Sequence, residues 1–344
     1  SAKQWATVGN IATSLRRHAP AWKALTATQE WSETAAQALR LAGDSDADTA
    51  TRLVAVRLTA MPGQLDDSVI ENIVELIHPR SPSELQLVAV SAVAESGRDD
   101  VAQRLLAGWR GHSPSIRTAV VDALLQRNQL RAELLNAIER GDIAVSDLDA
   151  SRRETLLTGG PPESQARAKE LLASTTSSSR SEVLELFRPA LELDAVIERG
   201  RAVFEKRCAA CHKLNGIGKS IGADLASLRD RSGSALLTAI LDPNRAVEAK
   251  FLAYTAVTSA GRSYSGMLLN ESGNSITLIG SDGKEHVLLR SELETLVATN
   301  RSLMPEGLEK DVSPQDIADV IAFVQTAASP SKRFAGNSPT TIRP

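Results

Sequence analysis

The first half of the chain has the hydrophobic periodicity of consecutive helices. Residues 1–175 carry apolar positions at helical spacing and few strand signals. The tetrapeptide Leu-Val-Ala-Val occurs at 53–56 and again at 87–90, and a looser echo, Thr-Ala-Val-Val, stands at 118–121. The spacing of about 31–34 residues predicts a structural unit that repeats along the chain.

Each repeat is expected to contain a second helix after a polar break. The tripeptide Ser-Pro-Ser opens two successive units, at 81–83 and 113–115, as a serine cap followed by proline in the first turn. The expected second helices are Asp67–Ile77, Asp99–Trp109 and Leu130–Arg140. Two-helix units of this length resemble an α-solenoid of the HEAT type, and an irregular helical bundle is the alternative.

Residues 251–290 have a different pattern, because apolar and polar positions alternate there. Turn signals such as Ser272-Gly273-Asn274 and Asp282-Gly283 interrupt the alternation. We therefore expect an antiparallel meander of four strands at Phe251–Thr258, Ser263–Leu269, Ser275–Gly280 and Glu285–Arg290.

An amphipathic helix is predicted over Val196–Arg207, with Gly200 inside its apolar stripe. Glycine in a helix interior costs about 1 kcal/mol relative to alanine, so Gly200 implies that another helix approaches closely. The expected partner is the last helix, which begins with Ser313 as N-cap and Pro314 at the first helical position. Its apolar face consists of Ile317, Val320, Ile321 and Val324.

Both cysteines of the chain lie in one pentapeptide, Cys208-Ala209-Ala210-Cys211-His212. This spacing is typical of c-type haem attachment, with two thioethers to the porphyrin and the histidine as proximal iron ligand. A structural zinc site needs four ligands, and a second cysteine pair is absent. A thioredoxin-like dithiol normally opens a helix, whereas this motif closes one. The sequence favours one covalent haem c, with the dithiol and zinc readings as alternatives.

A sixth iron ligand is expected from Met304, in the loop-like stretch Ser302–Pro305. Met267 is the rival sulfur, but it lies on a predicted strand and is expected to pack there. Histidine and methionine together raise the reduction potential and suit electron transfer. His286 is interpreted as structural, and no constellation surrounds the remaining histidines, His18, His78 and His112.

Composition narrows the class of protein. The 344 residues are 42% hydrophobic and 24% charged with a net charge of −3, as in an ordinary soluble protein. This charge gives no reason to expect nucleic acid or an anionic membrane as partner. No apolar run reaches the length of a membrane span. No catalytic triad, phosphate loop or carboxylate cluster stands out, so we expect an electron-transfer protein rather than an enzyme.

The haem region resembles a known family. The motifs Gly200-x3-Phe204-x3-Cys208-x2-Cys211-His212, Gly216-x-Gly218 and Ile221–Leu225 follow the class I cytochrome c pattern. Together with Leu241–Arg245, the strand insertion and the Met304 loop, they resemble the planctomycete/verrucomicrobial-type haem-binding domain. In such proteins the domain commonly follows a HEAT-like region and a β-propeller that resembles sugar dehydrogenases. The resemblance implies a dehydrogenase domain or subunit as electron donor, a respiratory acceptor, and a periplasmic or otherwise extracytoplasmic location. It also implies that the chain is a mature form or part of a longer polypeptide.

The resemblance extends to the haem pocket. The family usually has proline where Ala223 stands, and the carbonyl at that position accepts a hydrogen bond from the proximal histidine. Alanine keeps this carbonyl but lacks the fixed φ of proline. Gly222 and Leu225 are expected in the same pocket, and Arg245 is a candidate partner for a haem propionate, with a solvated arginine as the alternative.

The expected fold class is mainly α, with a helical haem domain that contains an inserted β meander. The domains are predicted as a HEAT-like region at 1–175, a linker at 176–192, a cytochrome c-like domain at 193–330 with the meander at about 251–290, and a tail at 331–344. The alternative function is a haem-based sensor or peroxidase-like enzyme with an open distal site. A di-haem peroxidase would need a second attachment motif, which the sequence lacks.

Overall fold

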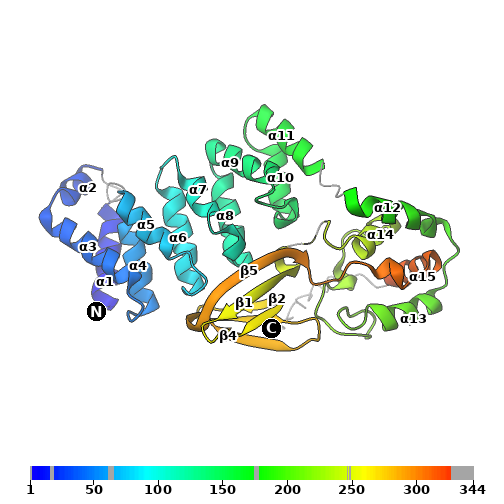
Figure 1. Cartoon of the computed structure of the whole chain (residues 1–344). Coiled ribbons are helices and arrows are strands. Elements are labelled where there is room, and N and C mark those ends of the chain that lie inside the picture. The colour runs from blue at the N-terminus through cyan, green and yellow to red at the C-terminus, as the bar shows by residue number, and fades with distance from the viewer. Residues whose placement is uncertain are drawn as a thin grey trace, which may run out of the picture. The chain divides into compact units, whose positions relative to one another are not determined.

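The computed structural model describes residues 2–15, 19–60, 66–173, 178–245, 247 and 249–326. The fold is mainly helical with one five-stranded antiparallel sheet (Figure 1). The chain forms two compact units, each discontinuous in sequence. The first combines residues 1–176 with 244–303, and the second combines 177–243 with 304–344.

The helices of the first unit pack as successive pairs (Figure 1). Their bounds are α1 Ala2–Leu15, α2 Ala19–Thr26, α3 Gln29–Gly43, α4 Thr49–Thr59, α5 Asp67–Glu75, α6 Ser83–Glu95, α7 Val101–Leu106, α8 Pro114–Leu125, α9 Asn128–Glu139, α10 Ala150–Thr158 and α11 Pro162–Ala173, with short 3₁₀ turns at Trp109–Gly111 and Val145–Asp147. One row of neighbours is α4, α6, α8 and α10, and a second contains α7, α9 and α11. The expected HEAT type itself stays a prediction.

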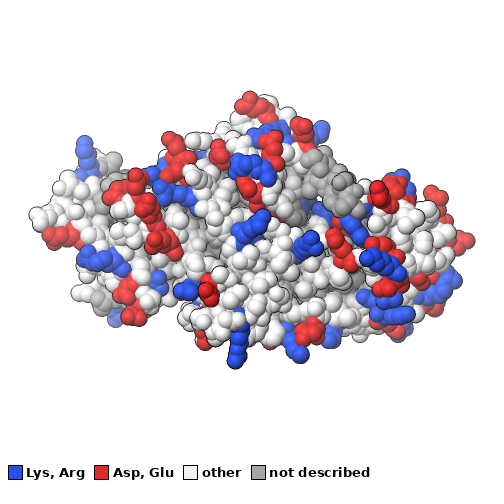
Figure 2. Space-filling view, in the orientation of Figure 1, with Lys and Arg blue, Asp and Glu red and all other residues white. Residues whose placement is uncertain are grey.

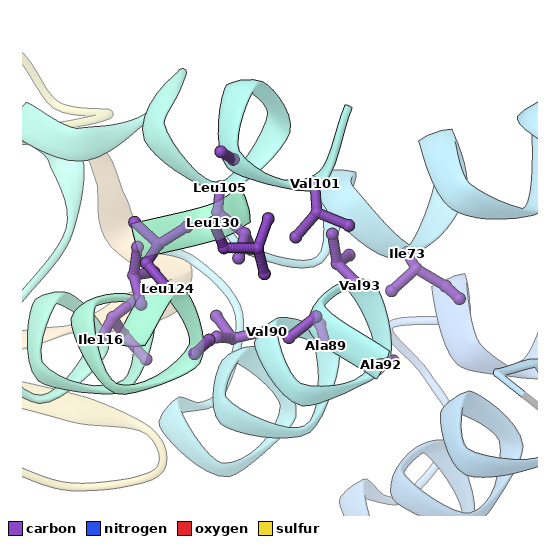
Figure 3. Close-up of a cluster of buried hydrophobic side chains, with 14 of the residues drawn as sticks. Ile73, Ala89, Val90, Ala92, Val93, Val101, Leu105, Ile116, Leu124 and Leu130 are labelled. Carbon is purple, nitrogen blue, oxygen red and sulfur yellow. The ribbon is translucent and has the colours of Figure 1, made fainter. Parts of the chain in front are cut away.

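The repeated apolar tetrapeptides contribute to the core of this unit through their last two residues, which are buried on α4, α6 and α8. Ala55 and Val56 are buried on α4, and Ala89 and Val90 on α6. Figure 3 shows Val90 beside Ile116 and other aliphatic side chains from neighbouring helices. The helix α7 is shorter than predicted and ends at Leu106, so the Trp109 end of the expected helix is a separate 3₁₀ turn.

The sheet has the strand order β4-β3-β2-β1-β5. Its strands are β1 Leu252–Thr258, β2 Ser263–Glu271, β3 Ser275–Ile279, β4 Glu285–Leu289 and β5 Leu293–Ser302. The four predicted strands are present with ends close to those expected. The fifth strand, β5, was not predicted, and it pairs antiparallel with β1 along the edge opposite β4.

Hydrogen bonds hold the sheet against the helices of the first unit. Glu271 on β2 accepts hydrogen bonds from Ser113 Oγ and Ser115 Oγ, each at 2.7 Å, and pairs with Arg290. Arg290 Nη1 also donates to the carbonyl of Pro79 at 2.8 Å. The domain boundaries predicted from chain position group the sheet with the haem region, whereas its packing groups it with the helical pairs.

The second unit contains four α-helices among its described residues. They are α12 Ser178–Phe187, α13 Ile197–Arg207, α14 Gly233–Leu241 and α15 Pro314–Gln325, with 3₁₀ turns at Arg188–Glu192, Leu225–Ser227 and Leu308–Lys310. The stretch expected as a linker, 176–192, is therefore helical from Ser178 onward. The serine-rich composition suggested a linker, but the stretch also contains apolar residues: Phe187 and Ala190 are buried in the core of this unit. The predicted tail, 331–344, lies outside the described residues.

The crossing of α13 and α15 forms the centre of the second unit, as the glycine in the apolar stripe predicts. A Cβ at Gly200 would lie 1.9 Å from the carbonyl oxygen of Asp319, so only glycine fits. The carboxylate of Asp319 accepts hydrogen bonds from the Val196 N–H at 2.7 Å and from Arg199 Nε at 2.6 Å. It thereby caps the start of α13, where the helix dipole favours negative charge.

Charged side chains of both signs are interspersed on the face drawn in Figure 2, consistent with the small net charge. No described helix combines the length and the apolar character that crossing a membrane requires.

Candidate functional site

The Cys-x-x-Cys-His motif forms a tight turn at the carboxyl end of α13. The Cys208 N–H donates to the carbonyl of Phe204 at 2.8 Å, which continues the helical bonding pattern. The N–H groups of Cys211 and His212 then both donate to the carbonyl of Cys208, at 3.1 and 2.9 Å. Both cysteines and the histidine are therefore held on one short, hydrogen-bonded turn.

The loop that follows the motif folds back onto it. The Ile221 and Gly222 N–H groups both donate to the carbonyl of Cys211, at 2.9 and 2.8 Å. Gly218 has a φ of +85°, and a Cβ there would lie 2.2 Å from the carbonyl oxygen of His212. A side chain at this position would push the loop away from the motif, which explains a glycine here.

The imidazole of His212 is oriented by this loop. Its Nδ1 lies 2.9 Å from the carbonyl oxygen of Ala223, so the contact expected from this carbonyl is present. A Cβ on Gly222 would lie 2.5 Å from Cε1 of the ring, so the absence of a side chain lets the ring approach the backbone this closely. Because the carbonyl fixes the proton on Nδ1, the lone pair of Nε2 is available to a metal.

Two observations concern the thiols of the motif and the groups around them. Burial raises the pKa of the Cys208 thiol to about 11, whereas the reactive cysteine of a redox dithiol has a lowered pKa. Among the described residues, His, Cys, Asp and Glu side chains do not assemble in groups of three that could hold a metal ion.

The other expected site residues fall in both units. Leu225 opens a 3₁₀ turn of the second unit and packs against its core. Met304 is half-buried and is the first residue of the segment with which the chain re-enters the second unit. Met267 is buried on β2 in the first unit, in agreement with its interpretation as a packing residue. Arg245 belongs to the first unit, in a turn after α14.

The histidines outside the motif have structural surroundings. His112 is buried with Nε2 3.1 Å from the carbonyl of Leu105, and desolvation lowers its pKa to about 4. It lines a cleft of about 490 Å³ in the first unit, together with His78, whose pKa burial also lowers. His286 on β4 packs against Tyr264, with ring centroids 4.9 Å apart and the rings tilted by 49°. His18 lies outside the described residues.

The chemistry of these donors fits a covalently bound haem. The two thiols at the attachment spacing and an imidazole whose Nδ1 is already bonded supply two thioethers and one axial nitrogen. Together with the crossed pair α13 and α15, they define a cytochrome c-like domain.

Comparison with protein families supports this class. The Cytochrome c family model matches residues 197–267, which include the attachment motif and the Ala223 loop. The match covers about a fifth of the chain and does not reach Met304. The comparison with curated proteins gave no match. A cytochrome c domain indicates haem-based electron transfer and the cofactor haem c.

Proposed function

We propose that this chain is an electron-transfer module with one haem c, bound covalently through Cys208 and Cys211 and ligated by His212 and Met304. The observation that carries the proposal is the bond between His212 Nδ1 and the Ala223 carbonyl, directly beside the two cysteines. Haem c, when bound, would supply reversible one-electron oxidation and reduction. Such a domain typically works outside the cytoplasm, and we propose that location for this chain.

The residues of the chain would hold and tune the cofactor. Cys208 and Cys211 fix it to the end of α13, and the Ala223 carbonyl strengthens His212 as a donor by accepting its proton's hydrogen bond. Gly218 and Gly222 keep the loop close enough for this bond. A sulfur ligand from Met304 would raise the reduction potential into a range that suits electron transfer.

Covalent attachment is tested by treating the purified protein with acid acetone and assaying pyridine haemochrome in both phases. We expect one haem per chain, all of it in the protein fraction. Haem that extracts into the organic phase, or one equivalent of zinc in its place, contradicts the proposal.

Axial ligation by Met304 is tested by Met304→Ala, with Met267→Ala as the matched control. The first variant should lose the weak sulfur-to-iron band at the red end of the oxidised spectrum and have a lower midpoint potential, whereas the second should keep both. The opposite result would assign the sulfur ligand to Met267.

We further propose that a dehydrogenase domain or subunit reduces the haem and that a respiratory acceptor oxidises it. The helical pairs, which we interpret as a HEAT-like region preceding a planctomycete/verrucomicrobial-type haem domain, would provide an extended surface for such partners. The test is stopped-flow reduction by sugar- or alcohol-oxidising dehydrogenases. Haem that stays oxidised with every donor, yet binds carbon monoxide or peroxide readily, would indicate a sensor or peroxidase-like protein.

A further inference from the structure

The chain leaves and re-enters the second unit next to the expected iron ligand. It leaves after Pro243, forms the sheet in the first unit, and returns at Met304. The returning segment has neither an α-helix nor a strand before Pro314, and its 3₁₀ turn spans only Leu308–Lys310. Gly307, with a φ of +95°, lies between Met304 and this turn. Secondary structure alone therefore does not fix the position of Met304.

One arginine joins this returning segment to the helix from which the chain leaves. Arg180 on α12 donates from Nη1 and Nη2 to the two carboxylate oxygens of Glu309, at 2.9 and 2.8 Å. Its Nε donates to the carbonyl of Leu241 at 2.9 Å, and Nη2 contacts the same carbonyl. Leu241 is the last residue of α14, so the cation also lies at the negative end of that helix.

The geometry makes Arg180 a restraint rather than a loose surface contact. The side chains of Arg180 and Glu309 are only 13% and 14% exposed, and the guanidinium engages the carboxylate with both terminal nitrogens. Such a fork fixes orientation as well as distance, which a lysine ammonium does not. The guanidinium also holds the pKa of Glu309 below its usual value, so the pair is ionised at neutral pH.

We propose that Arg180 is a positioning residue for the axial sulfur, because it fastens the segment that carries Met304 to α12 and α14. The inference rests on the proposed ligation by Met304. Neither Arg180 nor Glu309 lies within the residues that match the Cytochrome c family. This restraint would let the second unit hold Met304 in place, although the residues just before it, 244–303, belong to the first unit.

A loosened segment lowers the effective concentration of the sulfur at the iron, so external ligands compete better. Hydrogen bonds to charged groups contribute enough that losing the fork should raise the affinity for imidazole by about tenfold. The test uses the full haem-loaded chain and titrates imidazole into the oxidised protein and carbon monoxide into the reduced protein. The variants are Arg180→Lys and Glu309→Gln, with Arg188→Gln as matched control, because Arg188 pairs with Glu185 at an exposed position of the same unit.

We expect Arg180→Lys and Glu309→Gln to bind imidazole and carbon monoxide more tightly than the wild type and to have a weaker sulfur-to-iron band. Arg188→Gln should match the wild type in both respects. Soret circular dichroism checks that each variant is folded, and Glu309→Gln is the mildest change. If Met304→Ala removes the band but Arg180→Lys and Glu309→Gln both keep wild-type affinities for imidazole and carbon monoxide, the inference is overturned. If Met304→Ala leaves the band intact, the proposed ligation itself fails.

Discussion

Replacing Gly200 with alanine is expected to destabilise the second unit, although alanine is the better helix former. The new Cβ would lie 1.9 Å from the Asp319 carbonyl oxygen and 3.0 Å from the Cβ of Phe323. A backbone oxygen cannot rotate away, so α13 and α15 must separate and lose contacts along their whole crossing. Overpacking costs about 3 kcal/mol at the upper end of its usual range, and the helix preference of alanine offsets about 1 kcal/mol. A net loss of about 2 kcal/mol should remain.

The two units can be followed separately in one denaturant titration of the haem-loaded chain. Tryptophan fluorescence reports on the first unit, which contains all four tryptophans, and Soret circular dichroism reports on the second. In Gly200→Ala the Soret transition should move to lower denaturant while the fluorescence transition stays in place. Gly43→Ala is the matched control, because a Cβ on this last residue of α3 would contact nothing within 4 Å. An unchanged or stabilised Soret transition in Gly200→Ala would refute the close helix crossing.

Three further changes test other parts of the structure. Gly222→Ala should push the His212 ring off its carbonyl partner and shift the midpoint potential, measured by redox titration, because the Cβ would lie 2.5 Å from Cε1. Hydrogen bonds, above all from its arginine partner, lower the pKa of Asp319, so its carboxylate stabilises the fold above pH about 4 and this contribution is lost as the pH falls further. The Soret unfolding midpoint should therefore drop steeply below pH 4 in the wild type and less steeply in Asp319→Asn; equal slopes would contradict this. Glu271→Ala breaks a nearly buried ion pair and should cost the first unit about 3 kcal/mol by tryptophan fluorescence, whereas the exposed Glu285→Ala should not.

Local patterns in the sequence predicted the elements whose period is regular. The strand β1 follows from strict alternation, because every second residue of it is buried. The burial of β2, β3 and β4 is less regular, and the turn signals between these strands indicated where they begin and end. The fifth strand escaped this reasoning because its first buried residues, Leu293 and Leu296, are three positions apart, which is a helical spacing. Register irregularities in its pairing with β1 accompany this break. The helix α12 escaped because the serines at its start resemble a linker.

In the candidate site too, features marked by a local sequence pattern could be predicted, whereas a contact between distant residues without such a pattern could not. The attachment motif could be predicted from its local spacing, and the Ala223 contact was expected from the family resemblance; this contact is local, since the histidine and its acceptor are eleven positions apart. The Gly200 crossing could be predicted because a glycine on a buried stripe needs a partner helix. The Arg180–Glu309 pair joins residues 129 positions apart. A periodic pattern of charged residues does not predict which two of them will pair at such a distance. Only the tertiary structure reveals it.

The discontinuity of both units has a consequence for the order in which the protein is made. Synthesis proceeds from the amino end, so the cysteines of the attachment motif are made before any strand of the sheet. The first unit is complete only after residue 303 has been added, and the segment that carries Met304 follows immediately. Both cysteines are therefore present in an emerging chain while the first unit is still incomplete, although most of that unit precedes them in the sequence. A chain that stops between residues 243 and 304 would leave both units unfinished at once.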